Sequence, residues 1–124
     1  MRLLFGLLTL VCLTASCGGS DETKVELREQ AIVRGKALYD RYGCAVCHGP
    51  EGRGDGPVSR SITPPPRDFR DVEAFEKGRS LGAISETIRV GVEQKGVGMP
   101  GYPYIPESER RAIGAYVASL GESN

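Results

Sequence analysis

The feature that most constrains this chain of 124 residues is the pentapeptide Cys44-Ala45-Val46-Cys47-His48, which contains its only histidine and two of its four cysteines. This spacing is the attachment pattern of a c-type haem. On one helical turn each thiol can add to a haem vinyl group, while the adjacent imidazole can bind the iron. The sequence therefore predicts one covalently bound haem c, with Cys44 and Cys47 as thioether residues and His48 as an axial ligand.

Other uses of these residues lack partners in the sequence. A zinc site requires four ligands, and no second histidine is available to complete one. A thioredoxin-like redox pair requires a βαβ context, and no strand pattern is present. A plain disulfide between Cys44 and Cys47 in an oxidising compartment is the remaining alternative.

The second axial ligand follows by elimination. A stable low-spin electron carrier has a second donor from His, Met, Lys or Tyr, and the chain has no second histidine. Met1 is removed if the N-terminal segment is cleaved, which leaves Met99 ahead of Lys95 and Tyr102, because the last two prefer water or require deprotonation. The sequence therefore predicts Met99 as the second ligand of the iron, against the alternative of a side chain that only fills the core.

The N-terminus has the layout of a secretory signal over residues 1–16, with Arg2 before an apolar run about half as long as a bilayer span. The residues before Cys17 resemble a bacterial lipobox, in which the cysteine becomes the lipidated first residue. The alternative is an ordinary signal peptide that is cleaved elsewhere. We expect an exported protein on the periplasmic side, anchored to a bacterial membrane by a lipid on Cys17, with residues 17–28 as a flexible tether.

The rest of the chain is predicted to be all-α. Apolar residues at spacings of three and four indicate helices over residues 31–42, 80–91 and 106–120, and the segments between them are rich in Gly and Pro. Without the signal, about 100 residues with long loops have little apolar surface to bury. We therefore expect the haem to complete the core of a domain over residues 29–121, followed by a tail of residues 122–124.

Four features in this order resemble class I monohaem cytochromes c over residues 29–121: Gly35 with Tyr39, the pentapeptide with Gly49, Gly56-Pro57, and Gly98-Met99-Pro100 before a C-terminal helix. The resemblance implies a cytochrome c fold, with about three main helices packed around the haem and a close crossing of the first and last helices. Gly35 and Tyr116 are then the expected contact pair. The resemblance also implies that the carbonyl of Pro57 accepts a hydrogen bond from the imidazole of His48.

The function that this implies is electron transfer rather than catalysis. We expect a membrane-tethered carrier that takes single electrons from a quinol-oxidising complex or dehydrogenase and passes them to an oxidase or another cytochrome of a respiratory chain. The alternatives are an electron-entry subunit of a larger oxidoreductase complex, or a gas-binding or peroxidatic haem protein if Met99 is not a ligand. The balance of 16 basic and 16 acidic residues argues against a nucleic-acid partner.

Overall fold

The helices are the main elements of the chain in the computed structural model, which describes residues 19–94 and 97–122. Over this part of the chain the elements are α1 (Gly19–Arg41), α2 (Cys44–His48), two 3-10 turns (Ser59–Ser61 and Val72–Ala74), α3 (Leu81–Val90), β1 (Val92–Gln94), β2 (Val97–Met99) and α4 (Glu107–Leu120). The predicted helical fold is confirmed. Within the described residues no helix has both the length and the apolar character to cross a membrane.

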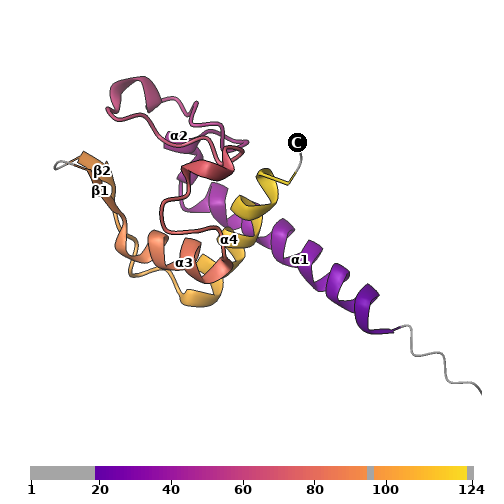
Figure 1. Cartoon of the computed structure of the whole chain (residues 1–124). Helices are drawn as coiled ribbons and strands as arrows, with labels where there is room; N and C mark the ends of the chain where they lie inside the picture. The colour runs from indigo at the N-terminus through magenta and orange to yellow at the C-terminus, as the bar shows by residue number, and fades with distance from the viewer. Residues whose placement is uncertain (1–18, 95–96, 123–124) are drawn as a thin grey trace, which may run out of the picture.

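The first helix is longer than the sequence predicted. We expected an irregular tether over residues 17–28, whereas α1 already begins at Gly19. Acidic side chains at Asp21 and Glu22 complement the positive end of the helix dipole, and the following residues are mostly good helix formers. As Figure 1 shows, the N-terminal part of α1 extends away from the rest of the molecule. The predicted signal peptide and Cys17 lie outside the described residues.

The closest helix contact is the crossing of α1 and α4. A Cβ atom added to Gly35 of α1 would lie 1.9 Å from the carbonyl oxygen of Ala112 and 3.0 Å from Cβ of Tyr116, both on α4. Only a glycine permits this approach of the two backbones. The predicted contact between Gly35 and Tyr116 is therefore confirmed.

The core lies between α1, α3 and α4. The side chain of Ser80 accepts a hydrogen bond from the backbone N–H of Ala83, which makes Ser80 the N-cap of α3. Helix α4 follows Pro106 and ends before Gly121. The buried apolar side chains of the core are Leu38, Tyr39, Ile84, Ile88, Ile105, Ala112, Ile113, Tyr116 and Val117.

A short hairpin between α3 and α4 was not predicted. Strands β1 and β2 pair antiparallel, with Val92 opposite Met99 and Glu93 opposite Gly98. Each strand has three residues, which is too short for an alternating pattern to be visible in the sequence. Gly91 joins α3 to the hairpin at φ +79°, and an added Cβ atom would lie 2.5 Å from the carbonyl oxygen of Met99. The hairpin is therefore held tightly against the end of α3.

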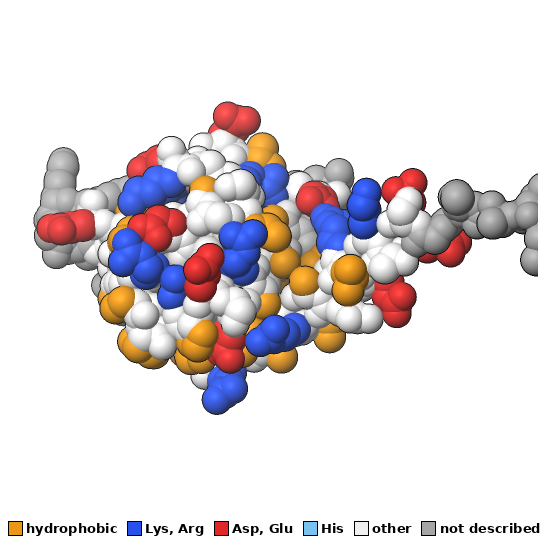
Figure 2. All heavy atoms as spheres, turned by 90° about the horizontal axis from the view of Figure 1, so that it is seen from below, with side chains coloured by type: hydrophobic (Ala, Val, Ile, Leu, Met, Phe, Trp, Pro, Cys, Tyr) orange, Lys and Arg blue, Asp and Glu red, His pale blue; other side chains and the backbone are white. Residues whose placement is uncertain are grey.

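The surface in the view of Figure 2 carries acidic and basic side chains side by side rather than in separate patches. Exposed ion pairs account for part of this arrangement, among them Lys36–Asp40 and Arg89–Glu86. Such pairs add little to stability, because solvent screens them.

Candidate haem site

The two cysteines of the pentapeptide lie on the single helical turn α2, which follows Gly43 in a left-handed conformation at φ +75°. Cys44 and Cys47 are half-buried and are both free thiols, so no disulfide joins them. Burial raises the pKa of the Cys44 thiol to about 11. The structure thus places two free thiols and the imidazole of His48 on one turn.

The segment after His48 is held by two tyrosines from the helix crossing. The hydroxyl of Tyr39 on α1 donates to the carbonyl of Gly49 over 2.7 Å, and that of Tyr116 on α4 donates to the carbonyl of Pro50 over 3.0 Å. Their rings meet edge to face, with centroids 5.2 Å apart. These bonds were not predicted from the sequence, although tyrosines on predicted buried faces are a signal for them, since a buried hydroxyl needs a partner.

One ring nitrogen of His48 has a backbone partner. Its Nδ1 atom lies 3.3 Å from the carbonyl oxygen of Arg67, and the ring of Phe69 stacks on the imidazole with centroids 4.4 Å apart. Burial lowers the pKa of the imidazole, and the Arg67 carbonyl opposes this shift. The carbonyl therefore favours a proton on Nδ1, which leaves Nε2 as the lone-pair nitrogen.

The partner of Nδ1 differs from the sequence-based expectation. We expected the carbonyl of Pro57, but the carbonyl that lies at this atom belongs to Arg67. Pro57 lies in an exposed loop that is bonded instead to α2, through Gly56 N–H to the Cys47 carbonyl (3.1 Å) and Val58 N–H to the Val46 carbonyl (3.3 Å). The chain then returns to His48 only ten residues after Pro57.

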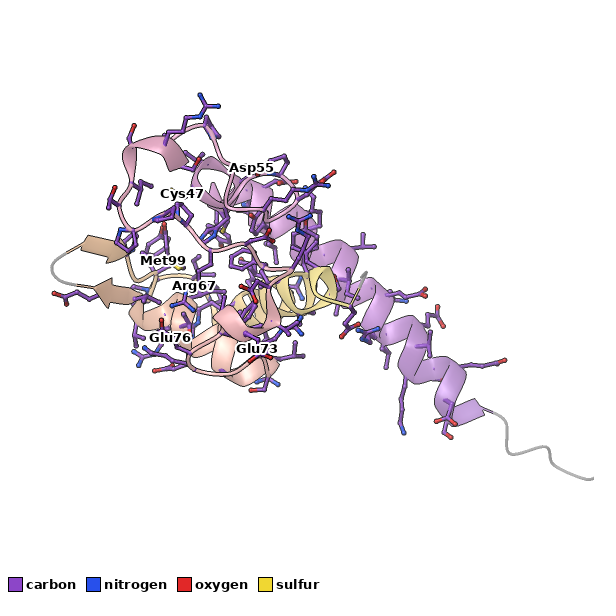
Figure 3. The ribbon with its side chains drawn as sticks, turned by 45° about the horizontal axis from the view of Figure 1, so that its top comes forward. Cys47, Asp55, Arg67, Glu73, Glu76 and Met99 are labelled. Atoms are coloured by element: carbon purple, nitrogen blue, oxygen red, sulfur yellow. The ribbon has the colours of Figure 1, made fainter. Side chains whose placement is uncertain are left out.

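Met99 lies on a separate wall of the site, at the end of β2. Its side chain is half-buried and packs against the core cluster. A pocket of about 290 Å³ opens beside it, between the end of α3 and the base of the hairpin. Cys44, Cys47 and His48 do not line this pocket. In Figure 3 Cys47 and Met99 come from two different segments on the same side of the molecule. The structure therefore groups Cys44, Cys47 and His48 on α2 and presents Met99 from the hairpin.

These residues fit a covalently attached haem. The donors are two free thiols on one turn, an imidazole with Nε2 available and a thioether from another segment. Several half-buried side chains pack against the core and would gain burial beneath a flat apolar group: Cys44, Ala45, Phe69, Phe75, Met99 and Tyr102. Within residues 19–94 and 97–122 no group of three or more His, Cys, Asp or Glu side chains is placed to hold a metal ion by itself.

Comparisons with known proteins agree with this assignment. The sequence model of the family Cytochrome c matches residues 32–121. A search of curated proteins gave no match. Among solved structures, the chain is similar to one described as "Kuenenia stuttgartiensis reducing HAO-like protein complex Kustc0457/Kustc0458", with a TM-score of 0.63 and 33% identity. That match covers 74% of this chain and 44% of the other, so this chain spans less than half the length of the protein it matches.

Proposed function

The chain belongs to the cytochrome c family, and from this premise we propose that it is a monohaem electron carrier whose iron is ligated by His48 and Met99. The observation that carries the proposal is the arrangement at α2, where two free thiols precede an imidazole whose Nδ1 lies at a backbone carbonyl. Such an engagement fixes the orientation of a ligating histidine and raises its basicity.

The bound haem supplies a one-electron Fe(III)/Fe(II) couple. Cys44 and Cys47 would attach it, and Nε2 of His48 and the thioether of Met99 would ligate the iron. A neutral thioether stabilises Fe(II) relative to a second imidazole. The half-buried aromatic rings Phe69 and Phe75 would help to exclude water near His48. With both residues as ligands, the chain would transfer electrons and would not bind a substrate at the iron.

The carrier works at a membrane in this proposal. Residues 1–16 are removed on export, Cys17 carries the lipid, and the domain faces the periplasm. The exposed start of α1, from Ser20 to Arg28, adds about 13 Å between the anchor and the crossing with α4. The donor is a quinol-oxidising complex or dehydrogenase and the acceptor is an oxidase or another cytochrome.

A second candidate is a fixed electron-entry subunit of a larger oxidoreductase. It is favoured by the similarity to a chain of a protein complex, of which this chain covers 44%. Detergent-solubilised native membranes distinguish the two functions. A free carrier elutes alone, whereas a fixed subunit copurifies with a partner in constant ratio.

Carbon monoxide tests the ligand assignment. The reduced wild type is expected to show a low-spin spectrum and to resist carbon monoxide, while Met99→Ala is expected to bind it rapidly. The matched control is Val90→Ala, which removes an exposed apolar group from the wall of the same pocket and supplies no donor. Rapid binding by the wild type would contradict ligation by Met99 and favour the gas-binding or peroxidatic alternative.

Mass spectrometry tests the anchor and the cofactor together. The intact native protein from membranes is expected to begin at Cys17 and to carry the mass of one haem and of acyl chains. The variant Cys17→Ser should lose the acyl mass and keep the haem. A colourless wild-type protein without haem mass would refute the proposed function.

A further inference from the structure

Arg67 contacts two partners with opposite ends of the residue. Its backbone carbonyl lies 3.3 Å from Nδ1 of His48, and its guanidinium forms an ion pair with the carboxylate of Glu76. The Arg67 side chain is 29% exposed and that of Glu76 is 63% exposed, so the pair is shielded from water only at its Arg67 end. The position of the carbonyl is therefore coupled to the ion pair through a single residue.

Phe69 adds a second link between the same two segments. Its ring stacks on the imidazole of His48, and its backbone N–H donates to the carbonyl of Gly52 over 2.8 Å. On its other side the ring lies 6.1 Å from the ring of Phe75, centroid to centroid. The turn that contains Phe75 and Glu76 thus supports both of the residues that contact the imidazole.

We propose that the Arg67–Glu76 ion pair positions the axial imidazole of His48 and thereby lowers the reduction potential of the haem. This inference rests on the proposed function, in which His48 ligates the iron. A strong hydrogen bond from Nδ1 to a carbonyl makes the imidazole a better donor, and a better donor favours Fe(III). Glu76 is a positioning residue, because it acts through Arg67 and not on the haem itself. Arg67 and Glu76 are both labelled in Figure 3.

A direct electrostatic effect predicts a different outcome from positioning. Loss of the negative charge of Glu76 raises the potential and loss of the positive charge of Arg67 lowers it, since a nearby positive charge disfavours Fe(III). Positioning predicts that both substitutions raise the potential, because each releases the same carbonyl. The sign for Arg67 therefore separates the two effects.

The deciding variant is Glu76→Asp in the haem-loaded protein, because it keeps the charge and removes one methylene from the reach of the carboxylate. We expect it to raise the reduction potential. We expect Arg67→Gln and Glu76→Gln also to raise it, and the double variant to raise it no further than the larger single change. The matched control is Glu73→Gln. Within the described residues the Glu73 carboxylate has no hydrogen bond or ion pair, so this variant should change the potential least.

Proton NMR of the reduced protein gives a readout independent of the potential. The Nδ1 proton of His48 should exchange with water faster in Glu76→Asp than in the wild type and at the wild-type rate in Glu73→Gln. Opposite shifts for Arg67→Gln and Glu76→Gln that cancel in the double variant, or an unchanged Glu76→Asp, would overturn the inference. If the inference fails but the wild-type protein keeps a low-spin haem spectrum, the proposed function still holds. A wild-type protein without haem would refute the proposed function instead.

Discussion

The hydroxyl of Tyr39 connects the helix crossing to the haem-attachment turn. The residue is almost completely buried, and its hydroxyl donates to the carbonyl of Gly49, the residue next to His48. Burial raises the pKa of this phenol far above its ordinary value, so the hydroxyl stays protonated and keeps donating at any physiological pH. At the scale of single residues, His48 is thus held both by its own ring contacts and by the chain that follows it.

We predict that Tyr39→Phe lowers the free energy of unfolding by about 1–3 kcal/mol, because it leaves the Gly49 carbonyl buried without its partner. Urea denaturation followed by circular dichroism measures the effect. The control is Tyr104→Phe, which removes a hydroxyl from a side chain that is 71% exposed and should change stability by less than about 0.5 kcal/mol. Equal effects of the two variants would contradict a structural role of the Tyr39 bond.

At the scale of elements, the contact between α1 and α4 determines where both tyrosines lie. Tyr39 on α1 and Tyr116 on α4 each reach a carbonyl of the segment after α2, over 2.7 and 3.0 Å. Both bonds depend on the small distance between the helices at Gly35. A change in the helix spacing therefore affects the segment after α2 without any direct contact with α2.

We predict that Gly35→Ala destabilises the protein by at least about 1–3 kcal/mol, because the new methyl group overlaps the Ala112 carbonyl and forces the helices apart. The control is Gly82→Ala in the first turn of α3, where the nearest atoms lie 3.9 Å from an added Cβ atom. There the substitution should stabilise by up to about 1 kcal/mol, since alanine favours the helix. Thermal unfolding of the two variants would show opposite shifts, and a neutral Gly35→Ala would refute the tight crossing.

We predict that Ser80→Ala destabilises the protein by about 1 kcal/mol, because α3 loses the side-chain oxygen that accepts from the Ala83 N–H. Denaturant titration of this variant and of a control variant, Ser108→Ala, measures the two free energies of unfolding. Ser108 lies in the first turn of α4 and, among the described residues, its hydroxyl has no hydrogen-bond partner. That control should be neutral or slightly stabilising. A similar loss in both variants would mean that the cap contributes nothing specific to α3.

At the scale of the whole molecule, several apolar side chains next to the core are only half-buried. The fully buried cluster lies between α1, α3 and α4, while side chains of α2, the 67–76 segment and the hairpin remain half-buried around it. A flat apolar group attached at Cys44 and Cys47 would cover these side chains. In that arrangement the haem would be part of the core as well as the redox centre.

We predict that Cys44→Ala/Cys47→Ala, which cannot attach haem, leaves the chain largely unfolded. The expected observations are loss of most helical signal in circular dichroism and narrow dispersion of amide signals in NMR. Wild-type protein with attached haem is the reference for both measurements. A well-folded double variant without haem would contradict the conclusion that the haem completes the core.

Much of this protein could be predicted from local patterns. The pentapeptide predicted the attachment turn, and stripes of apolar residues predicted α3 and α4. The paired small and aromatic residues Gly35 and Tyr116, expected from the resemblance, form the crossing of α1 and α4. These features can be predicted from the sequence because residue spacing along a helix places side chains on one face independently of the tertiary structure.

The sequence by itself determined which atoms are available for chemistry, because thiols, an imidazole and a thioether are properties of residue types. The tertiary structure decides which backbone atoms meet them. The carbonyl at His48 belongs to Arg67 and not to Pro57. Every residue has the same carbonyl, so no residue type distinguishes the one that reaches Nδ1. Which carbonyl reaches Nδ1 depends on the path of the loop after α2, and contacts between residues far apart in the sequence determine that path.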